Sequence, residues 1–271
     1  MQKSITEATS RYRFLEKMST GELLNHINFE DQSVALAVER SLGQLEHLIN
    51  AVVPIIRAGG RLFYIGAGSS GRLGILDASE CPPTYGVPEN MVNGIIAGGD
   101  SAIRRAVENA EDDETKGFDD LQVHHITAKD FVVGIAASGK TPYVVGALKN
   151  CKLLGIPTAC IVCNPDTPLA KVSDYPVEII VGPEFVSGST RMKAGTAQKM
   201  ALNMISTSLM IKLGKVKDNK MVDLKVNNMK LRERAVRIIC EETGTTPETA
   251  AELLSKYGSV RAAIEDIFNN R

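Results

Sequence analysis

The sequence has 271 residues, of which 44% are hydrophobic, and a formal net charge of −1 at pH 7. This length allows one large domain with a small appendage, and the balanced charge excludes a bulk electrostatic attraction to nucleic acid or anionic lipid. No apolar run reaches the roughly 18 residues of a membrane-spanning helix, so no membrane span is expected.

The five cysteines are an odd number and lie scattered along the chain. Residues 1–17 are polar and mixed in charge, without the apolar segment of a signal peptide. Both features favour reduced thiols in a cytoplasmic protein. Cys160-x-x-Cys163 falls within an apolar segment, so buried thiols are favoured over a metal site. We therefore expect neither a disulfide framework nor a bound metal.

The first 56 residues are predicted to form an N-terminal helical segment. From Asp31 onward, apolar residues recur at spacings of three and four, which indicates one long helix with Asp31 at its N-cap. Pro54 and the pair Gly59-Gly60 are expected to end this helix. Its apolar stripe, from Val38 to Val52, either faces the core or contributes to a subunit interface.

Between residues 57 and 220, short apolar segments alternate with helical ones. Strands are expected at residues 62–65, 92–97, 131–136, 158–163 and 177–181. Helices are expected at 71–80, ended by Pro82-Pro83, and at 101–114 and 142–154. This alternation predicts an α/β fold, a doubly wound parallel five-stranded sheet with N-terminal helices.

The last part of the chain is predicted to be helical throughout. Residues 189–213 are mostly apolar and rich in small side chains, which is typical of a buried helix. Residues 221–271 are more charged and form a small C-terminal helical appendage, with helices near 247–255 and 259–268. The expected domains are thus 1–56, 57–220 and 221–271.

The loop after the first strand matches the dinucleotide fingerprint, Gly66-x-Gly68-x-x-Gly71. That fingerprint also needs an acidic residue at the end of the second strand, to hold a ribose. Here the second strand ends in Ala97-Gly98-Gly99, and Asp100 comes too late. Nicotinamide binding is therefore disfavoured.

The loop after the third strand matches a phosphate-binding P-loop, Gly134-x-x-x-x-Gly139-Lys140-Thr141. Gly134, however, falls inside the strand itself. The remaining residues, 138–141, are too few to wrap the phosphates of a nucleotide. A nucleotidase is therefore disfavoured as well.

Both loops instead suit a single phosphate monoester. Ser69 and Ser70 follow the first strand, and Ser138 and Thr141 follow the third. Each pair opens a helix, whose free backbone N–H groups and partial positive charge attract an anion. The alternative is that these hydroxyls only cap their helices.

Two glutamates are the candidate acid–base groups. Glu80 follows Leu73 and Leu76 on one helical face, near the predicted helix C-terminus, and both burial and the helix end disfavour its charged form. Glu111 follows Ile103 and Val107 at spacings of four residues, which would place it on their apolar face of a helix. A carboxyl group in such a place suits general acid–base catalysis, although either residue could also be a solvated helix end.

The four histidines offer no obvious catalytic triad. None of them lies in a glycine-rich loop, and the pair His124-His125 is predicted to form a surface turn. The carboxylates therefore stay the leading candidates for proton transfer.

Long motifs in the chain resemble those of the N-acetylmuramic acid 6-phosphate etherases, and the resemblance extends from about residue 5 to residue 242. The motifs that carry it are residues 64–73 and 77–84, Gly98-Gly99-Asp100, residues 106–112 and residues 182–196. The resemblance implies a sugar-isomerase (SIS) fold, with a sugar-phosphate-binding domain at 57–220.

The resemblance also implies a reaction and its residues. Members of this family cleave the D-lactyl ether of N-acetylmuramic acid 6-phosphate by elimination and hydration, which gives N-acetylglucosamine 6-phosphate and D-lactate. The two catalytic glutamates of the family correspond to Glu80 and Glu111 here. No metal or redox cofactor is implied, and the family forms homodimers with sites near the subunit interface.

Two alternatives share the same fold. A non-catalytic sugar-phosphate-sensing regulatory protein would bind a phosphosugar without needing Glu80 and Glu111. An aldose–ketose phosphosugar isomerase would use similar proton chemistry but would release no lactate.

Overall fold

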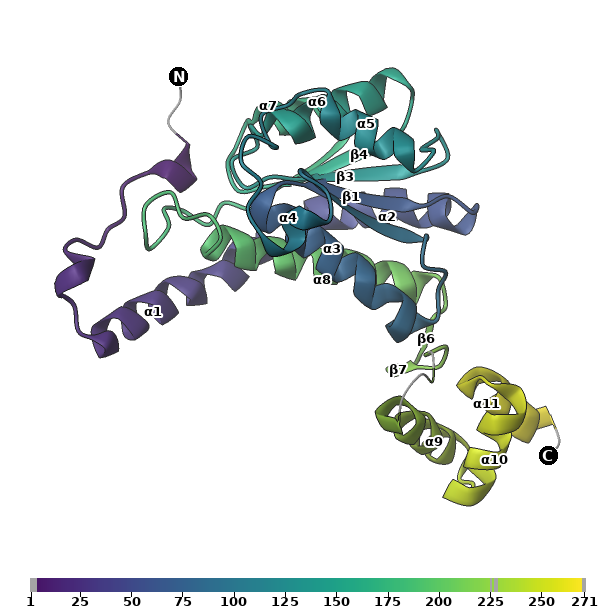
Figure 1. Cartoon of the computed structure of the whole chain (residues 1–271). Helices are drawn as coiled ribbons and strands as arrows, with labels where there is room; N and C mark the ends of the chain where they lie inside the picture. The colour runs from purple at the N-terminus through teal and green to yellow at the C-terminus, as the bar shows by residue number, and fades with distance from the viewer. Residues whose placement is uncertain (1–3, 225, 227–228, 270–271) are drawn as a thin grey trace.

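The computed structural model describes residues 4–224, 226 and 229–269 (Figure 1). Its centre is a five-stranded parallel sheet in the order β2-β1-β3-β4-β5. The strands are β1 (Leu62–Gly66), β2 (Val92–Ile96), β3 (Phe131–Ile135), β4 (Thr158–Val162) and β5 (Tyr175–Glu178). Every residue of β1, β3 and β4 is buried, as expected for strands covered on both faces. The predicted doubly wound sheet is confirmed.

Helices cover both faces of this sheet (Figure 1). One face packs against α5 (Lys116–Val123), α6 (Pro142–Leu153) and α7 (Pro168–Val172). The other packs against α1 (Thr20–Glu39), α2 (Leu42–Arg57), α3 (Gly68–Tyr85) and α8 (Lys193–Lys212). Alternate strand residues supply the two cores, so that Phe63 joins one and Tyr64 the other.

The single helix predicted from Asp31 is in fact two helices. α1 begins much earlier, at Thr20, and its N-cap residue Ser19 forms a capping box with Glu22. Asp31 therefore lies inside this helix. The helix is interrupted at Arg40–Ser41, before α2 begins at Leu42. The Ser41 hydroxyl donates to the carbonyl of Glu178 at 2.9 Å. Two helices in succession can continue one apolar stripe, so the periodicity does not reveal the break. Most of that stripe is buried in the core of its own chain, whereas Leu42, at the start of α2, is 46% exposed.

The prolines expected to end helices do not do so. Pro54 lies within the last turn of α2, and α3 runs through Pro82 and Pro83 to Tyr85. α3 ends at Gly86, whose φ of 65° is the left-handed C-cap conformation. A Cβ atom at Gly86 would lie 1.9 Å from the carbonyl oxygen of Asp223, so only glycine fits there.

The helix predicted over 101–114 is also wrong beyond its first turn. α4 covers only Ser101–Arg104, and Arg105 is extended. Residues 106–115 form turns and irregular structure, in which Asn109 has a positive φ of 59°. Ile103, Val107 and Glu111 therefore do not form a helical stripe.

The C-terminal residues form a helical unit with its own core, as predicted. After a short hairpin of β6 (Val216–Lys217) and β7 (Lys220–Met221) come α9 (Met229–Thr243), α10 (Pro247–Tyr257) and α11 (Val260–Asn269). Figure 1 shows these helices beyond the end of α8, away from the sheet. The division at 56/57 and 220/221 stays a prediction, although α1 and α2 share a core with the sheet. Within the described ranges, no helix is long and apolar enough to cross a membrane.

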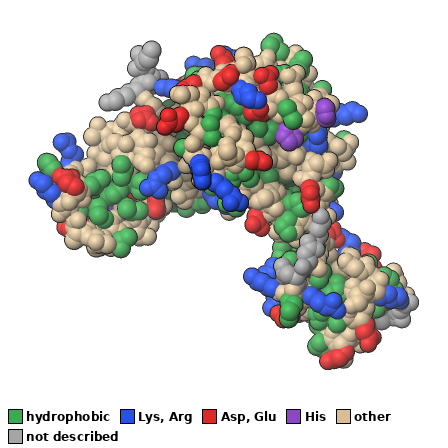
Figure 2. Space-filling model, in the orientation of Figure 1, with side chains coloured by type: hydrophobic (Ala, Val, Ile, Leu, Met, Phe, Trp, Pro, Cys, Tyr) green, Lys and Arg blue, Asp and Glu red, His purple; other side chains and the backbone are tan. Residues whose placement is uncertain are grey.

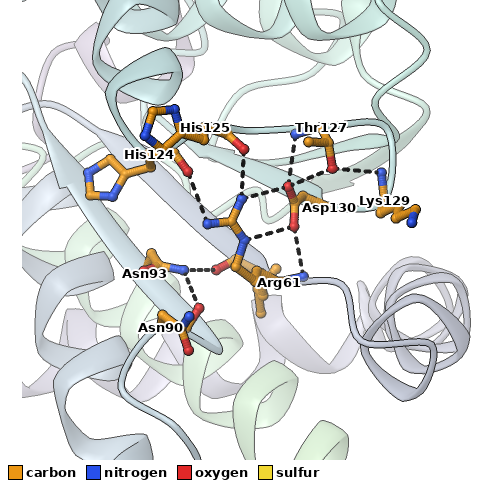
Figure 3. A network of polar contacts seen from close by, with 9 residues as sticks. Arg61, Asn90, Asn93, His124, His125, Thr127, Lys129 and Asp130 are labelled. Atoms are coloured by element: carbon orange, nitrogen blue, oxygen red, sulfur yellow. Dashed lines mark hydrogen bonds and ion pairs between the residues drawn. The ribbon is translucent and has the colours of Figure 1, made fainter.

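An ion pair holds the amino ends of β1 and β3 together (Figure 3). The Arg61 guanidinium donates to both carboxylate oxygens of Asp130, at 3.0 and 2.9 Å, and to the carbonyls of His124 and His125. Burial would raise the pKa of Asp130, but the bonds from Arg61 and from the Thr127 N–H lower it overall. This network lies at the opposite edge of the sheet from the glycine-rich loops.

Candidate functional site

The two glycine-rich loops lie side by side at the carboxyl edge of the sheet. β1 pairs with both β2 and β3, so the loops that follow β1 and β3 leave neighbouring strands. The chain adds β2 on one side of β1 and then adds β3, β4 and β5 on the other side, and sheets of this type bind ligands at such a switch point, here between β1 and β3. The helix N-termini of α3 and α6 start from these loops, at Gly68 and Pro142.

The four predicted phosphate ligands differ in what they contact. Ser70 is buried, and its hydroxyl donates to the side-chain oxygen of Gln198 on α8 at 2.9 Å. The Ser138 hydroxyl accepts from the Lys140 N–H at 3.2 Å. Ser69 and Thr141 make no side-chain hydrogen bond to any residue that the structure describes. The hydroxyls of Ser69, Ser138 and Thr141 can therefore still donate to a phosphate, whereas that of Ser70 is engaged.

A cavity of about 430 Å³ opens beside the first loop. It is lined by the N-terminal turn of α3, by Ala97 at the end of β2, and by the irregular segment 106–112, which includes Glu111. The Glu111 carbonyl accepts from the Tyr143 N–H in the first turn of α6, at 3.0 Å. Glu111 thus lies where the loops after β1 and β3 meet, although it is exposed rather than set on an apolar helical stripe.

Glu80 is not part of this cavity in a single chain. From Ser69 to Glu80, α3 rises about 16 Å at roughly 1.5 Å per residue, away from the carboxyl edge. Glu80 is exposed, and its neighbour on the same face, Leu76, is 44% exposed, so the burial predicted for Glu80 is absent. The structure therefore brings Glu111, but not Glu80, to the loops of its own chain.

A buried polar cluster that sequence reasoning missed lies between β1, α3 and α8. The Asp77 carboxylate accepts from the Ser206 hydroxyl at 3.1 Å, and Lys199 lies 3.8 Å away. Burial raises the pKa of Asp77, while Ser206 and Lys199 act in the lowering direction. The signal was available, because Asp77 falls one turn from both Leu73 and Cys81 on the inner face of the helix. This cluster fixes α3 against α8.

A second missed cluster holds the loop that follows β5. The Glu184 carboxylate accepts the N–H groups of Lys193 and Ala194, at 2.8 and 3.0 Å, and so caps α8. Burial raises the pKa of Glu184, against the lowering effect of these N–H groups. Lys193 in turn pairs with Glu30 on α1 at 2.6 Å. Glu184, Lys193 and Ala194 lie within the motif at 182–196, which by itself indicated only the family resemblance, whereas nothing in the sequence pairs Glu30 with Lys193.

The irregular N-terminal segment also reaches the carboxyl edge. The Ser4 hydroxyl and the Ile5 N–H donate to the side-chain oxygen of Asn164, which follows β4, at 2.8 and 2.7 Å. Further along, the Ser10 N–H donates to the hydroxyl of Ser187 at 2.8 Å. This segment therefore borders the site on the side of the β4 and β5 loops.

Known proteins resemble this chain over nearly its whole length. Two family models match: the N-terminal SIS domain of glucokinase regulatory protein over residues 44–152, and the SIS domain over residues 104–208. A Christiangramia forsetii protein named N-acetylmuramic acid 6-phosphate etherase is 56% identical over 98% of this chain and 97% of its own. A Bacteroides thetaiotaomicron protein of the same name is 54% identical, over 96% and 94%.

Solved structures with this fold are more distant in sequence. An Escherichia coli CFT073 protein matches with a TM-score of 0.53 and 18% identity, over 74% of this chain and 97% of its own. A Bacteroides fragilis protein, described as a phosphosugar isomerase involved in capsule formation, matches with a TM-score of 0.55 and 21% identity, over 73% and 94%. At such identities the likeness shows the shared SIS fold alone.

Proposed function

We propose, from the premise that this chain belongs to the N-acetylmuramic acid 6-phosphate etherase family, that it cleaves the D-lactyl ether of N-acetylmuramic acid 6-phosphate. The products are N-acetylglucosamine 6-phosphate and D-lactate, which places this carbon–oxygen lyase in the recycling of cell-wall sugar. The observation that carries this proposal is identity above 50% over nearly the whole chain to relatives of that name. The same observation disfavours the regulatory alternative.

The chemistry explains why carboxylates suffice. An ether is a poor leaving group unless a carbanion forms next to it. Opening the sugar to its aldehyde makes the C2 proton acidic, and a base then removes it. The lactyl oxygen leaves C3 as it takes a proton, and water adds to the resulting double bond. These steps need proton transfer at C2, at the lactyl oxygen and at the added water. They need neither a metal nor a redox cofactor.

We assign proton transfer to Glu111 and Glu80. Glu111 lines the cavity beside the Gly68 turn, which supports a role at the C2 proton or at the water. Glu80 is assigned to the lactyl oxygen. Because Glu80 lies about 16 Å along α3 from Ser69, it cannot serve the site of its own chain. It acts instead in the site of a second subunit.

This assignment requires a homodimer. The exposed face of α3, with Glu80 and the partly exposed Leu76, is free to meet a second copy. α1 also carries large exposed apolar side chains, namely Leu24, Phe29 and Leu36 at 63%, 60% and 56%. Figure 2 shows apolar side chains gathered at the α1 end of the molecule. Such surface on a single chain supports burial against a partner.

The phosphate is assigned to the two loops at the carboxyl edge. Ser69, Ser138 and Thr141 supply hydroxyl donors, and α3 and α6 supply N-terminal N–H groups. Ser70 contributes its backbone rather than its hydroxyl, because that hydroxyl is bonded to Gln198. The described cysteines are all free thiols, which supports a cytoplasmic location.

One assay tests the proposal. The purified chain is incubated with N-acetylmuramic acid 6-phosphate, and D-lactate is measured with a D-lactate dehydrogenase coupled to nicotinamide absorbance. Release of D-lactate in equal amount to N-acetylglucosamine 6-phosphate is expected. Conversion of the sugar without lactate would indicate an isomerase, and binding without conversion would indicate a regulator.

A further inference from the structure

Among the described residues that line the cavity beside the α3 turn, Arg72 is the one cationic side chain. It lies one turn into α3 from Gly68, and both residues line the cavity with Glu111. The Arg72 guanidinium donates to the carbonyl of Ile103 at 2.9 Å and to that of Arg105 at 3.4 Å. These bonds use the Nε–H and one N–H of Nη2. An arginine carries five such donors, so three stay available.

Arg72 has no counter-ion in the described part of its own chain. It makes no ion pair there, although Glu108, Glu111 and Asp112 line the same cavity. The two carbonyls that it contacts hold the guanidinium in place without neutralising its charge. A fixed and uncompensated guanidinium at a cavity wall is a binding group for an anion.

The substrate carries two anionic groups, and so far only the phosphate has an assigned binding site. The phosphate is assigned to neutral donors at the loops after β1 and β3. The lactyl group ends in a carboxylate, which must lie near C3 and hence near the groups that act there. Three acidic side chains line the cavity and would repel this carboxylate everywhere except at Arg72.

We propose that Arg72 binds the carboxylate of the lactyl group and so selects lactyl ethers over uncharged ones. This inference rests on the proposed function and adds to it a residue for substrate specificity. The planar guanidinium matches a carboxylate with two parallel N–H···O bonds. An anion held there is oriented before the ether bond breaks, which supports the reaction by positioning.

The test compares two substrates in matched variants. One is N-acetylmuramic acid 6-phosphate, and the other is the 3-O-isopropyl ether of N-acetylglucosamine 6-phosphate, in which a methyl group replaces the carboxylate. The quantity measured is the ratio of kcat/KM for the two ethers. Any difference in leaving-group chemistry is the same for every variant and cancels when the ratios are compared.

Arg72→Gln should lower this ratio by about 10- to 100-fold, the usual value of a hydrogen bond to a charged group. Arg72→Lys, which keeps the charge without the planar geometry, should lower it less. Arg104→Gln is the control, because Arg104 is a neighbouring exposed arginine that does not line the cavity. Its ratio should equal that of the wild type.

An unchanged ratio in Arg72→Gln would overturn the proposal. If Arg72 only tethers residues 103–105, or if it binds the phosphate, both ethers lose activity equally and the ratio stays constant. Dissociation constants of the two ethers, measured by calorimetry on the same variants, give an independent ratio that needs no turnover. A wild type that binds both ethers but releases no lactate would refute the proposed function, while the calorimetric ratio still decides the role of Arg72.

Discussion

The ammonium group of Lys193 lies 2.6 Å from a carboxylate oxygen of Glu30, and both residues are almost fully buried, at 2% and 3% exposure. The other Glu30 oxygen accepts from the Tyr12 hydroxyl at 3.2 Å. α1, the N-terminal irregular segment and the start of α8 therefore meet at this one ion pair. Because the Lys193 N–H also bonds to Glu184, the position of the loop after β5 depends on Glu30, which lies far away in the sequence.

Glu30→Gln should destabilise the protein by about 3–5 kcal/mol, because it leaves the Lys193 charge buried without a partner. The measurement is urea unfolding followed by circular dichroism. The double variant Glu30→Gln/Lys193→Met should recover part of the loss, since the buried ammonium is removed and Arg11, the other cation paired with Glu30, is 64% exposed. Glu114→Gln serves as a surface control, because its ion pair with Lys149 is about half exposed and should change stability by less than about 1 kcal/mol.

Glu111→Gln should lower the rate of D-lactate release by about 10²- to 10⁴-fold, which is the usual contribution of a general acid or base. The isosteric change leaves the fold intact, as circular dichroism should verify. Glu114→Gln is a matched control on the same loop, because Glu114 does not line the cavity. A Glu111→Gln enzyme with normal turnover would remove Glu111 from the mechanism.

Mixing Glu111→Gln with Glu80→Gln tests whether Glu80 acts in the partner's site. If each site takes Glu111 from one subunit and Glu80 from the other, a mixed dimer contains one intact site. After subunit exchange in equal amounts, about one quarter of the wild-type activity should return. If both glutamates served the same chain, every site would contain one substitution and the mixture would stay inactive.

Ser69→Ala and Ser70→Ala should have different consequences although the residues are neighbours. Ser69→Ala should raise KM for the phosphosugar with little effect on stability, because its hydroxyl contacts no described residue. Ser70→Ala should cost about 1–3 kcal/mol of stability, because it leaves the buried oxygen of Gln198 without a donor. Steady-state kinetics and urea unfolding on both variants separate the two effects. Equal behaviour would refute this distinction.

The Arg61–Asp130 pair should make stability fall in acid. The pKa of Asp130 is lower in the folded state than in the unfolded state, because the bonds from Arg61 and Thr127 outweigh burial. Its contribution is therefore complete above the unfolded value, roughly 3.9, and is lost as the pH falls through the folded value. Urea unfolding between pH 3 and pH 7 should show this loss in the wild type and a flatter profile in Asp130→Asn.

Asp77→Asn is the control of opposite sign for that experiment. Burial raises the pKa of Asp77, so its ionisation costs stability as the pH rises from the unfolded value through the folded one. Replacing Asp77 by Asn should remove this cost, so that stability depends less on pH above the unfolded pKa. Asp130→Asn, by contrast, should reduce the dependence of stability on pH below that value. If both variants changed the profile in the same direction, the two assignments could not both hold.

Local pattern predicted the sheet well because a buried parallel strand needs a continuous apolar run, and that run is visible in the chain itself. The segments around Phe63, Val132 and Cys160 are of this kind. The loops after β1 and β3 could be recognised in the same way, from neighbouring residues alone. In each of them glycine and serine follow an apolar strand and precede a helix. Periodicity failed where two helices continue one stripe, as at Ser41.

The sequence by itself determined the strands, the two glycine-rich loops, the burial of α8 and the family. Only the tertiary structure decided that 106–115 is irregular, that the Ser70 hydroxyl is bonded to Gln198, and that Glu80 lies far from the loops of its own chain. These outcomes depend on contacts such as Tyr143 N–H with the Glu111 carbonyl, which join residues distant in the chain. Residue spacing encodes the energy of a local helix or strand, but not the partner that a polar group finds after the chain has folded.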